Sequence, residues 1–182
     1  MEFTATQIPD VIVIDPIVYE DKRGFFMETW QEQKFRDAGI DARFVQSNHS
    51  RSSFGVLRGL HYQVSQAQGK LIRVIQGEAF DVAVDLRKSS PTFGQWVGET
   101  LSAGNRKLIW IPPGFAHGFL ILSELADFEY HTTNLYAPEH ERSFRWDDPD
   151  LAISWPLAEG QKPLLSKNDE AGVFLDDAEV YA

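Results

Sequence analysis

Two short motifs in the middle of the chain constrain its fold more than any other feature of the sequence. Gly55–Gln63 reads GVLRGLHYQ, and Pro112–Phe119 reads PPGFAHGF. Each joins a glycine or proline turn to an apolar run with a single histidine, a pattern typical of a short strand beside a tight turn. The pair therefore indicates two strands of a β-rich domain, each of which carries one imidazole.

The two motifs resemble the half-motifs of a cupin, a small double-sheet β-barrel that usually binds a metal. A metal-binding cupin has G-x5-H-x-H, then a glutamate, and later a third histidine. Gly55 and His61 keep this spacing, but Gln63 replaces the second histidine, and Ala67 and Gln68 stand where the glutamate is expected. Two imidazoles and an amide are a poor ligand set for a catalytic first-row metal. We therefore expect a barrel that performs acid/base chemistry without a metal.

Most of the remaining chain also has the pattern of short strands separated by turns, and Ala79–Leu86 alternates strictly between large apolar and other residues. Many short strands are typical of a sandwich or barrel. We predict one all-β domain over residues 1–182, a double-stranded β-helix (cupin-like jelly-roll barrel) with a few short helices. The strands are expected at Val11–Tyr19, Gly24–Trp30, Arg43–Arg51, Val56–Gln63, Lys70–Gln76, Ala79–Leu86, Gln95–Leu101, Leu108–Ile111, His117–Leu122 and Phe128–Leu135, and the helices at Gln31–Ala38 and after Ser166.

The composition excludes several classes of protein. Apolar residues make up 43% of the 182 residues and aromatic residues 13%, which is typical of a globular chain. There is no cysteine, so neither a disulfide nor a thiolate nucleophile can form. The net charge of −10 argues against general nucleic-acid binding. The N-terminus lacks the pattern of a secretory signal and no run has the length of a membrane helix, so we expect a cytoplasmic protein without a membrane partner.

Several polar side chains in the predicted strands are candidates for catalysis. Arg58 and His61 lie in one apolar strand, where burying both without a function would be costly. His117 follows the Pro-Pro-Gly turn, at the rim where sites in barrels form. Tyr130 and His131 are neighbours on one strand and point to opposite faces. Tyr130 would suit a proton donor in the cavity, which leaves His131 facing outward.

Other charged residues fit both a structural and a functional interpretation. Lys70 is either an ordinary lysine at a strand edge or a cation directed at a developing oxyanion. Asp169 closes an S-K-N-D capping box and could also orient a histidine. Arg23 precedes G-F-F, which suits phosphate binding and base stacking but also an ordinary edge strand. The pattern does not decide whether Asp81 faces the solvent or the cavity.

Together these segments resemble the dTDP-4-dehydrorhamnose 3,5-epimerases, a family of metal-free, cupin-like enzymes of deoxysugar biosynthesis. The one departure noted is His131, which stands where a lysine is frequent and thus fits an outward position. The matching stretches are Arg23–Phe26 with Glu28, Gln46–Ser50, Gly55–Gln63, Gly69–Val74, Phe80–Arg87, Pro113–Phe119, Tyr130–Tyr136 and Leu165–Asp169.

The resemblance implies a role for each matched position. His61 is the general base, Asp169 orients it, Tyr130 is the general acid, and Lys70, with help from His117, stabilises an enolate oxygen. Arg23 and Arg58 meet the diphosphate, Gln46, Ser47 and Asn48 hold the nucleotide, Phe25 and Glu28 contact the thymine end, and Glu141 and Lys167 also line the site. The resemblance further implies a dTDP-4-keto-6-deoxyhexose substrate, no cofactor, and a homodimer in which nucleotide-binding residues can reach the partner's barrel.

These residue types suit the chemistry of such a substrate. C3 and C5 both flank the C4 carbonyl of a 4-keto sugar, so their protons are acidic and their removal gives an enolate. An imidazole, whose ordinary pKa is about 6.5, is a fitting base at neutral pH. A fixed cation near O4 accelerates the reaction because it meets charge that exists only after deprotonation.

Three alternatives remain at this stage. The protein could be a narrower epimerase that inverts only C3 or C5, because such relatives keep the same catalytic residues. It could be a non-catalytic sugar-nucleotide-binding cupin, although the joint presence of His61, Lys70, Tyr130 and Asp169 argues against this. A metal-dependent cupin oxygenase or isomerase is disfavoured by Gln63 and the missing glutamate.

Overall fold

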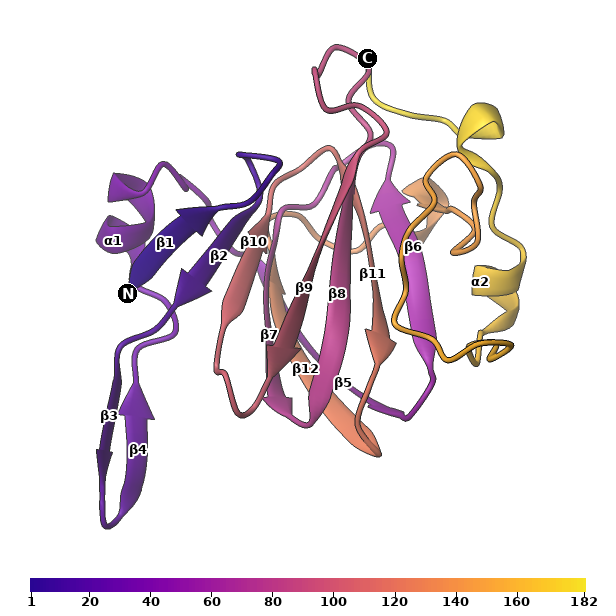
Figure 1. The fold of residues 1–182 in the computed structure, drawn as a ribbon. Helices are drawn as coiled ribbons and strands as arrows, with labels where there is room; N and C mark the ends of the chain where they lie inside the picture. Colours follow the sequence, from indigo (N-terminus) through magenta and orange to yellow (C-terminus); the bar gives the residue numbers. More distant parts are fainter.

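The computed structural model describes residues 1–182 and contains two antiparallel β-sheets that pack face to face (Figure 1). The six-stranded sheet has the order β1-β2-β10-β7-β12-β5, and the five-stranded sheet has the order β13-β6-β11-β8-β9. This arrangement confirms the predicted all-β jelly roll. The strands are β1 (Glu2–Ala5), β2 (Ile12–Asp15), β3 (Val18–Asp21), β4 (Gly24–Met27), β5 (Gln46–Ser53), β6 (Leu57–Gln63), β7 (Lys70–Gln76), β8 (Glu78–Asp85), β9 (Trp96–Ser102), β10 (Leu108–Ile111), β11 (Phe115–Ile121), β12 (Leu125–Thr132) and β13 (Glu141–Ser143).

The main core fills the space between the two sheets. Ile72 and Phe128 project into it from the large sheet, and Ala83 and Phe119 from the small one. The rings of Phe119 and Phe128 stack with their centroids 3.9 Å apart. Because these side chains fill the middle of the barrel, an open pocket between the two sheets can form only towards the ends of the barrel.

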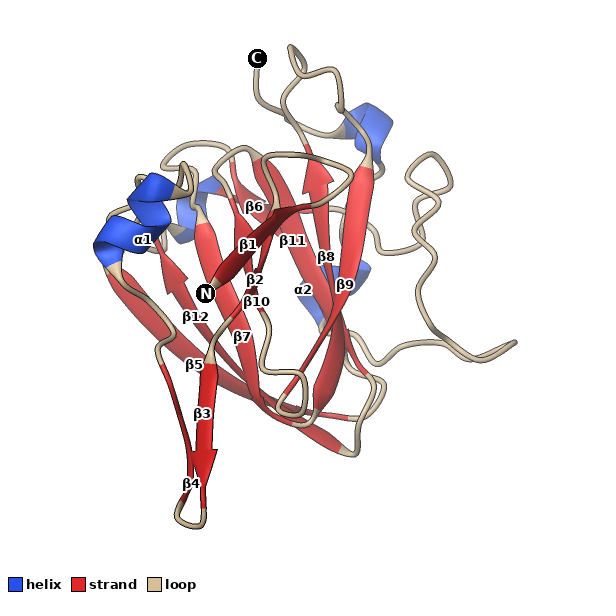
Figure 2. Cartoon of the chain, turned by 60° about the vertical axis from the view of Figure 1, so that its left-hand side comes forward, coloured by secondary structure: helices blue, strands red, loops and turns tan.

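Each sheet is also covered on its outer face, so several strands are apolar on both sides. On the large sheet, Phe35 of α1 (Glu32–Asp37) packs with Leu71 and Trp110. The outer face of β8 contacts residues of the C-terminal segment, which include Trp155 and Leu175. Figure 2 shows how few helices the fold contains, and none of them is long and apolar enough to cross a membrane.

The predicted strands lie where expected, with local differences. The segment Val11–Tyr19 is two strands, β2 and β3, because Pro16 between them has no amide hydrogen for a sheet ladder. β1 and β13 are absent from the predicted set, since each is short and has no clear alternation. The alternation of Ala79–Leu86 is confirmed: Phe80, Val82, Val84 and Leu86 share the outer face of β8.

A two-stranded hairpin, β3–β4, pairs with no other strand and extends away from the two sheets (Figure 1). It carries exposed aromatic residues, of which Phe26 is 71% and Tyr19 64% exposed. Arg106 contacts both of its strands: its Nη1 lies 2.6 Å from Glu20, and its guanidinium stacks over the ring of Phe25. The hairpin thus exposes aromatic side chains, and Arg106 holds it close to its turn, at the Glu20–Phe25 pair.

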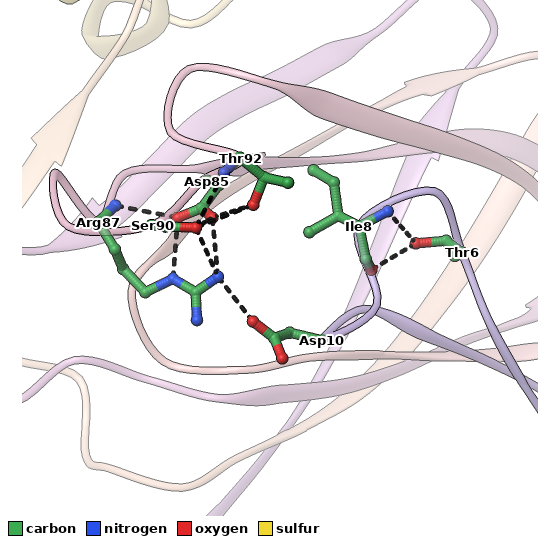
Figure 3. A network of polar contacts seen from close by, with 7 residues as sticks. All are labelled: Thr6, Ile8, Asp10, Asp85, Arg87, Ser90 and Thr92. Carbon is green, nitrogen blue, oxygen red and sulfur yellow. Dashed lines mark hydrogen bonds and ion pairs between the residues drawn. The ribbon is translucent and has the colours of Figure 1, made fainter.

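A buried carboxylate fixes the loop after β8 (Figure 3). Asp85 is fully buried and accepts hydrogen bonds from Arg87, Ser90 and Thr92. Burial alone would raise the pKa of Asp85, but these hydrogen bonds lower it to about 2. Arg87 also pairs with Asp10 at 2.7 Å, so the network ties the N-terminal segment to this end of the barrel. The polar groups of this network already have hydrogen-bond partners within it, as a structural network requires.

Candidate active site

One end of the barrel contains a pocket of about 280 Å³ in which polar side chains from both sheets converge. It is lined by Gln46 and Asn48 of β5, His61, Tyr62 and Gln63 of β6, Lys70 of β7, Tyr130 of β12, Glu141 of β13, and Gln68 and Tyr136 of the connecting loops. Larger hollows of about 960 and 760 Å³ occur on other faces, but neither combines an imidazole, a lysine and a phenol. The small pocket is therefore the best candidate for acid/base chemistry.

His61 forms a close pair with Asp169 of α2 (Lys167–Glu170). Their Nε2 and Oδ1 atoms are 2.7 Å apart, and Asp169 is only 2% exposed. The same Oδ1 accepts a hydrogen bond from the Gly59 amide at 3.1 Å. A side chain at Gly59 would collide with Gly118, because a Cβ there would lie 2.5 Å from the Gly118 Cα. Gly59 thus allows β6 to pack closely on β11, while its amide also ties β6 to α2 through Asp169.

Asp169 caps α2 and contacts the imidazole of His61 at the same time. Its Oδ2 accepts hydrogen bonds from the hydroxyl and the amide of Ser166, which completes the predicted capping box. Burial acts to raise the pKa of Asp169, but the hydrogen bonds from His61, Ser166 and Gly59 lower it to about 2. A permanent anion therefore lies beside His61, where it can orient the ring and stabilise an imidazolium.

Lys70 and Tyr130 line the same pocket as His61. Burial lowers the pKa of Lys70 to about 8, while the negative charges of Asp81 and Glu141 oppose this effect. Burial also raises the pKa of the Tyr130 phenol, although the positive charge of Arg58 acts in the opposite direction. At neutral pH the pocket thus holds a cation and a protonated phenol next to the His61–Asp169 pair.

Tyr130 and His131 point to opposite sides of β12, as expected. Tyr130 packs against the core between the sheets, whereas His131 lies outside the large sheet near the ring of Phe44. His117 pairs with His61 across β11 and β6 and is nearly buried behind the pocket. Its Nε2 is 2.8 Å from Asp81 Oδ2, and Asp81 faces the interior of the barrel rather than the solvent.

Gln63, at the position of a cupin metal ligand, is fully engaged with the backbone of the pocket loops. Its Nε2 donates to the carbonyls of Gln66 and Leu135, and its Oε1 accepts from the Ala137 amide. No group of three or more His, Cys, Asp or Glu side chains is placed to hold a metal ion. The side-chain amide of Gln63 therefore holds the loops at the mouth of the pocket in place.

Several residues that the sequence analysis assigned to nucleotide binding lie outside the pocket of their own chain. Arg23 is on the exposed hairpin, where it pairs with Asp21, and Phe25 lies on the same hairpin. Glu28 pairs with Lys34 at 2.7 Å. Ser47 is exposed on β5, between the pocket residues Gln46 and Asn48, and Lys167 is exposed at the start of α2.

Arg58 lies close to the pocket but not in its lining. Its Nε donates to Ser52 Oγ at 3.1 Å, and the side chain remains exposed. Its positive charge nevertheless acts to lower the pKa of the Tyr130 phenol, so Arg58 is a neighbour of the pocket.

Tyr136, for which the sequence indicated no role, lines the pocket and is 52% exposed. Its hydroxyl donates to Glu141 Oε2 at 2.9 Å, and its amide donates to Gln46 Oε1 at 3.0 Å. An exposed ring beside a polar pocket is well suited to stacking on a planar base. Tyr136 lies in a loop without periodicity, so only its aromatic character could have indicated this position.

Comparisons with known proteins agree with this geometry. Residues 5–177 match the family model of dTDP-4-dehydrorhamnose 3,5-epimerase. A Pseudomonas aeruginosa protein of that name is 58% identical over 182 residues, which cover 100% of this chain and 99% of the relative.

Solved structures give the same result. The crystal structure of dTDP-6-deoxy-D-glucose-3,5-epimerase from Legionella pneumophila in complex with dTDP-4-keto-L-rhamnose has a TM-score of 0.94 and 52% identity, with coverage of 98% of this chain and 94% of that one. A 3'-monoepimerase from Streptomyces bikiniensis in complex with dTDP-quinovose has a TM-score of 0.88 and 34% identity, with coverage of 94% and 87%. The chain therefore belongs to the dTDP-4-dehydrorhamnose 3,5-epimerase family.

Proposed function

We propose that this protein converts dTDP-4-dehydro-6-deoxy-D-glucose into dTDP-4-dehydro-L-rhamnose by inverting C3 and C5. The observation that carries the proposal is the convergence of the His61–Asp169 pair, Lys70 and Tyr130 on one pocket. These groups are a base with its orienting carboxylate, a cation and a proton donor, which are the parts that an epimerisation next to a ketone requires.

Proton abstraction is the first step of the proposed reaction. His61 takes the proton from C3 or C5, the C–H electrons form a C=C bond, and the C4 carbonyl electrons move onto O4. The Asp169 carboxylate stabilises the imidazolium that results. Lys70 stabilises the charge on O4, and this interaction gains strength only as the enolate forms, so it lowers the barrier rather than the ground state.

Reprotonation from the other face completes the inversion. Tyr130 donates its phenolic proton to the carbon from the side opposite His61, and the O4 electrons restore the carbonyl. The high pKa of the buried phenol keeps it protonated for this step. The tyrosinate and the imidazolium then return to their starting states by proton exchange with solvent, so no cofactor is consumed.

The same proposal includes a homodimer in which the β3–β4 hairpin completes the site of the partner. Lys70 is the one lysine or arginine that lines the pocket, although the substrate carries a diphosphate. Arg23 and Phe25 lie on a hairpin that projects from the barrel, and β5, which supplies Gln46 and Asn48 to the pocket, is an edge strand. An exposed edge with free backbone groups readily accepts a strand from another chain, so the hairpin of one subunit can dock beside β5 of its partner. Ser47 and Lys167 remain candidate contacts for the part of the nucleotide that extends outside.

The function is tested by proton NMR of the product that the purified protein forms from dTDP-4-dehydro-6-deoxy-D-glucose. We expect inversion at both C3 and C5 with the wild-type protein and a loss of at least about 100-fold for His61→Ala, which should still bind dTDP. His131→Ala serves as the matched control, because His131 faces away from the pocket, and should retain turnover. Inversion at only one carbon would replace the proposal with a single-centre epimerase, and dTDP binding without turnover would replace it with a binding protein.

Mixing two impaired variants, His61→Ala and Arg23→Ala, tests whether the hairpin of one subunit completes the site of its partner. In a mixed dimer, the intact His61 of one subunit meets the intact Arg23 of the other, so one of the two sites is complete. Random reassociation should restore about a quarter of the wild-type activity. No recovery, despite proven mixed dimers, would show that Arg23 acts within its own chain.

A further inference from the structure

Asp81 is a buried carboxylate for which the reaction described above has no use. It lies in the middle of β8 on the face that points between the sheets, and it is 0% exposed. Its Oδ2 contacts His117 Nε2 at 2.8 Å, whereas its Oδ1 has no hydrogen-bond partner. An unpartnered carboxylate oxygen in the interior is costly, so a function or a nearby positive charge is needed to explain it.

The contact with Asp81 defines the hydrogen position on His117. A carboxylate can only accept hydrogen bonds, so Nε2 of His117 must carry the hydrogen. Burial lowers the pKa of His117, Asp81 opposes this, and the charges of Lys70 and His61 lower it further. The imidazole is therefore neutral at neutral pH, and the Asp81–His117 pair keeps a net charge of −1.

Lys70, which lines the pocket in front of this negative pair, is the nearest candidate for its cation, although it forms no direct ion pair with Asp81. Among the neighbouring charges that hold the pKa of Lys70 up against burial, Asp81 acts most strongly and Glu141 follows. Glu141 lies at the pocket mouth, where it accepts the hydroxyl of Tyr136. Asp81 lies deep in the barrel, where water cannot screen its charge. The titratable and charged groups around the pocket come from separate strands: Asp81 from β8, Glu141 from β13, His61 from β6, His117 from β11 and Tyr130 from β12.

We propose that Asp81 is a positioning residue whose carboxylate, held in place by neutral His117, is the buried counter-charge that keeps Lys70 protonated beside the reacting oxygen. The role of Lys70 at that oxygen rests on the proposed function. The charge balance between Asp81 and Lys70 does not, because it depends only on the burial of Asp81, its unpartnered oxygen and the position of Lys70 in the pocket. A corollary concerns His117: a neutral imidazole whose Nε2 hydrogen is bound to Asp81 has no second hydrogen to donate to an enolate oxygen.

The experiment measures the titration of Lys70 directly, without turnover. The probe is the ¹³Cε NMR signal of Lys70 in uniformly lysine-labelled full-length protein, assigned by its loss in Lys70→Arg. Asp81→Asn preserves the shape of the side chain and an oxygen that accepts from His117, but it removes the charge. We expect the Lys70 midpoint to fall by about one pH unit or more in this variant, and the alkaline limb of kcat to move down with it.

The matched control is Asp85→Asn, because Asp85 is another buried carboxylate on the same strand and belongs to the Arg87 network. It should lose stability and leave the Lys70 midpoint unchanged. An unchanged midpoint in Asp81→Asn would overturn the proposal, even if activity fell. A lowered midpoint in a protein that shows no epimerisation would support the charge pairing while refuting the function.

A second variant keeps the test decisive if Asp81→Asn does not fold. Adding Lys70→Met removes the cation that would otherwise be left without its counter-charge. Recovery of the fold in the double variant supports the pairing of Asp81 with Lys70. A double variant that is no more stable than Asp81→Asn alone contradicts it.

Discussion

Replacing Asp169 with Asn separates its charge from its shape and tests the role of the His61–Asp169 pair. The carboxylate accepts from His61, Gly59 and Ser166, and these contacts lower its pKa from 3.8 to about 2. Since the pKa is depressed in the folded state, the stabilisation is fully present above about pH 4 and is lost as the pH falls towards 2. The difference corresponds to about 2 kcal/mol at neutral pH, so Asp169→Asn should lower Tm by about 4–8 °C.

The effect on catalysis should exceed what this loss of stability causes. A hydrogen bond to a charged group contributes about 1.5–3 kcal/mol, which here would no longer stabilise the imidazolium of His61. The expected result is a fall in kcat of about 10- to 150-fold, measured well below Tm so that the enzyme remains folded. KM should change little, because Asp169 does not line the pocket.

Ser166→Ala is the control that isolates the helix cap. It removes the hydroxyl that donates to Asp169 Oδ2 and accepts from the Asp169 amide, but it leaves the contact with His61 intact. The loss of the cap should cost about 0.5–2 kcal/mol, with kcat close to that of the wild type. If Ser166→Ala lost as much kcat as Asp169→Asn, the carboxylate would act through the helix alone and the reasoning would be refuted.

Four further outcomes are expected. Activity should fall as the pH rises through about 8, because Lys70 then loses its proton; a pH profile that stays level to pH 10 would contradict this. Tyr130→Phe should retain solvent exchange at the substrate carbons better than inversion, and an equal loss of both in NMR assays would argue against a dedicated acid. Arg106→Ala should raise KM and weaken the dimer, as measured by kinetics and analytical ultracentrifugation, because Arg106 anchors the hairpin; unchanged values would exclude that role. Phe144→Ala should lose about 3–5 kcal/mol in urea unfolding, since Phe144 is fully buried, and a loss below about 1 kcal/mol would show that the site had repacked.

The sequence predicted the strands well wherever one pattern dominated. The alternation of Ala79–Leu86 and the turn at Pro112–Gly114 each correspond to an observed element, because period and turn chemistry are local properties. The sequence could not decide whether the Asp81 side chain faces the solvent or the barrel interior. Both faces of β8 are covered, and alternation alone does not say which of them is the interior. Whether a residue faces the inside depends on the packing of other sheets, which local patterns do not contain.

Predicting the residues of the candidate active site required the family resemblance more than local sequence patterns. Asp169 lies far from His61 in the sequence and reaches it only because β6 and α2 pack together. A capping box predicts the backbone contacts of Asp169 but not the partner of its second oxygen. Tyr136 was missed for a related reason: a loop residue has no periodicity, and its place at the pocket follows from its contacts with Gln46 and Glu141.

Solvent deuterium incorporation into dTDP-4-dehydro-6-deoxy-D-glucose by the purified, chelator-treated protein is the most direct test of proton abstraction by His61. We expect deuterium at both C3 and C5 in the product, with His61→Ala incorporating none. Absence of deuterium at both carbons, in a protein that still binds dTDP, would contradict proton abstraction by His61 and with it the proposed reaction.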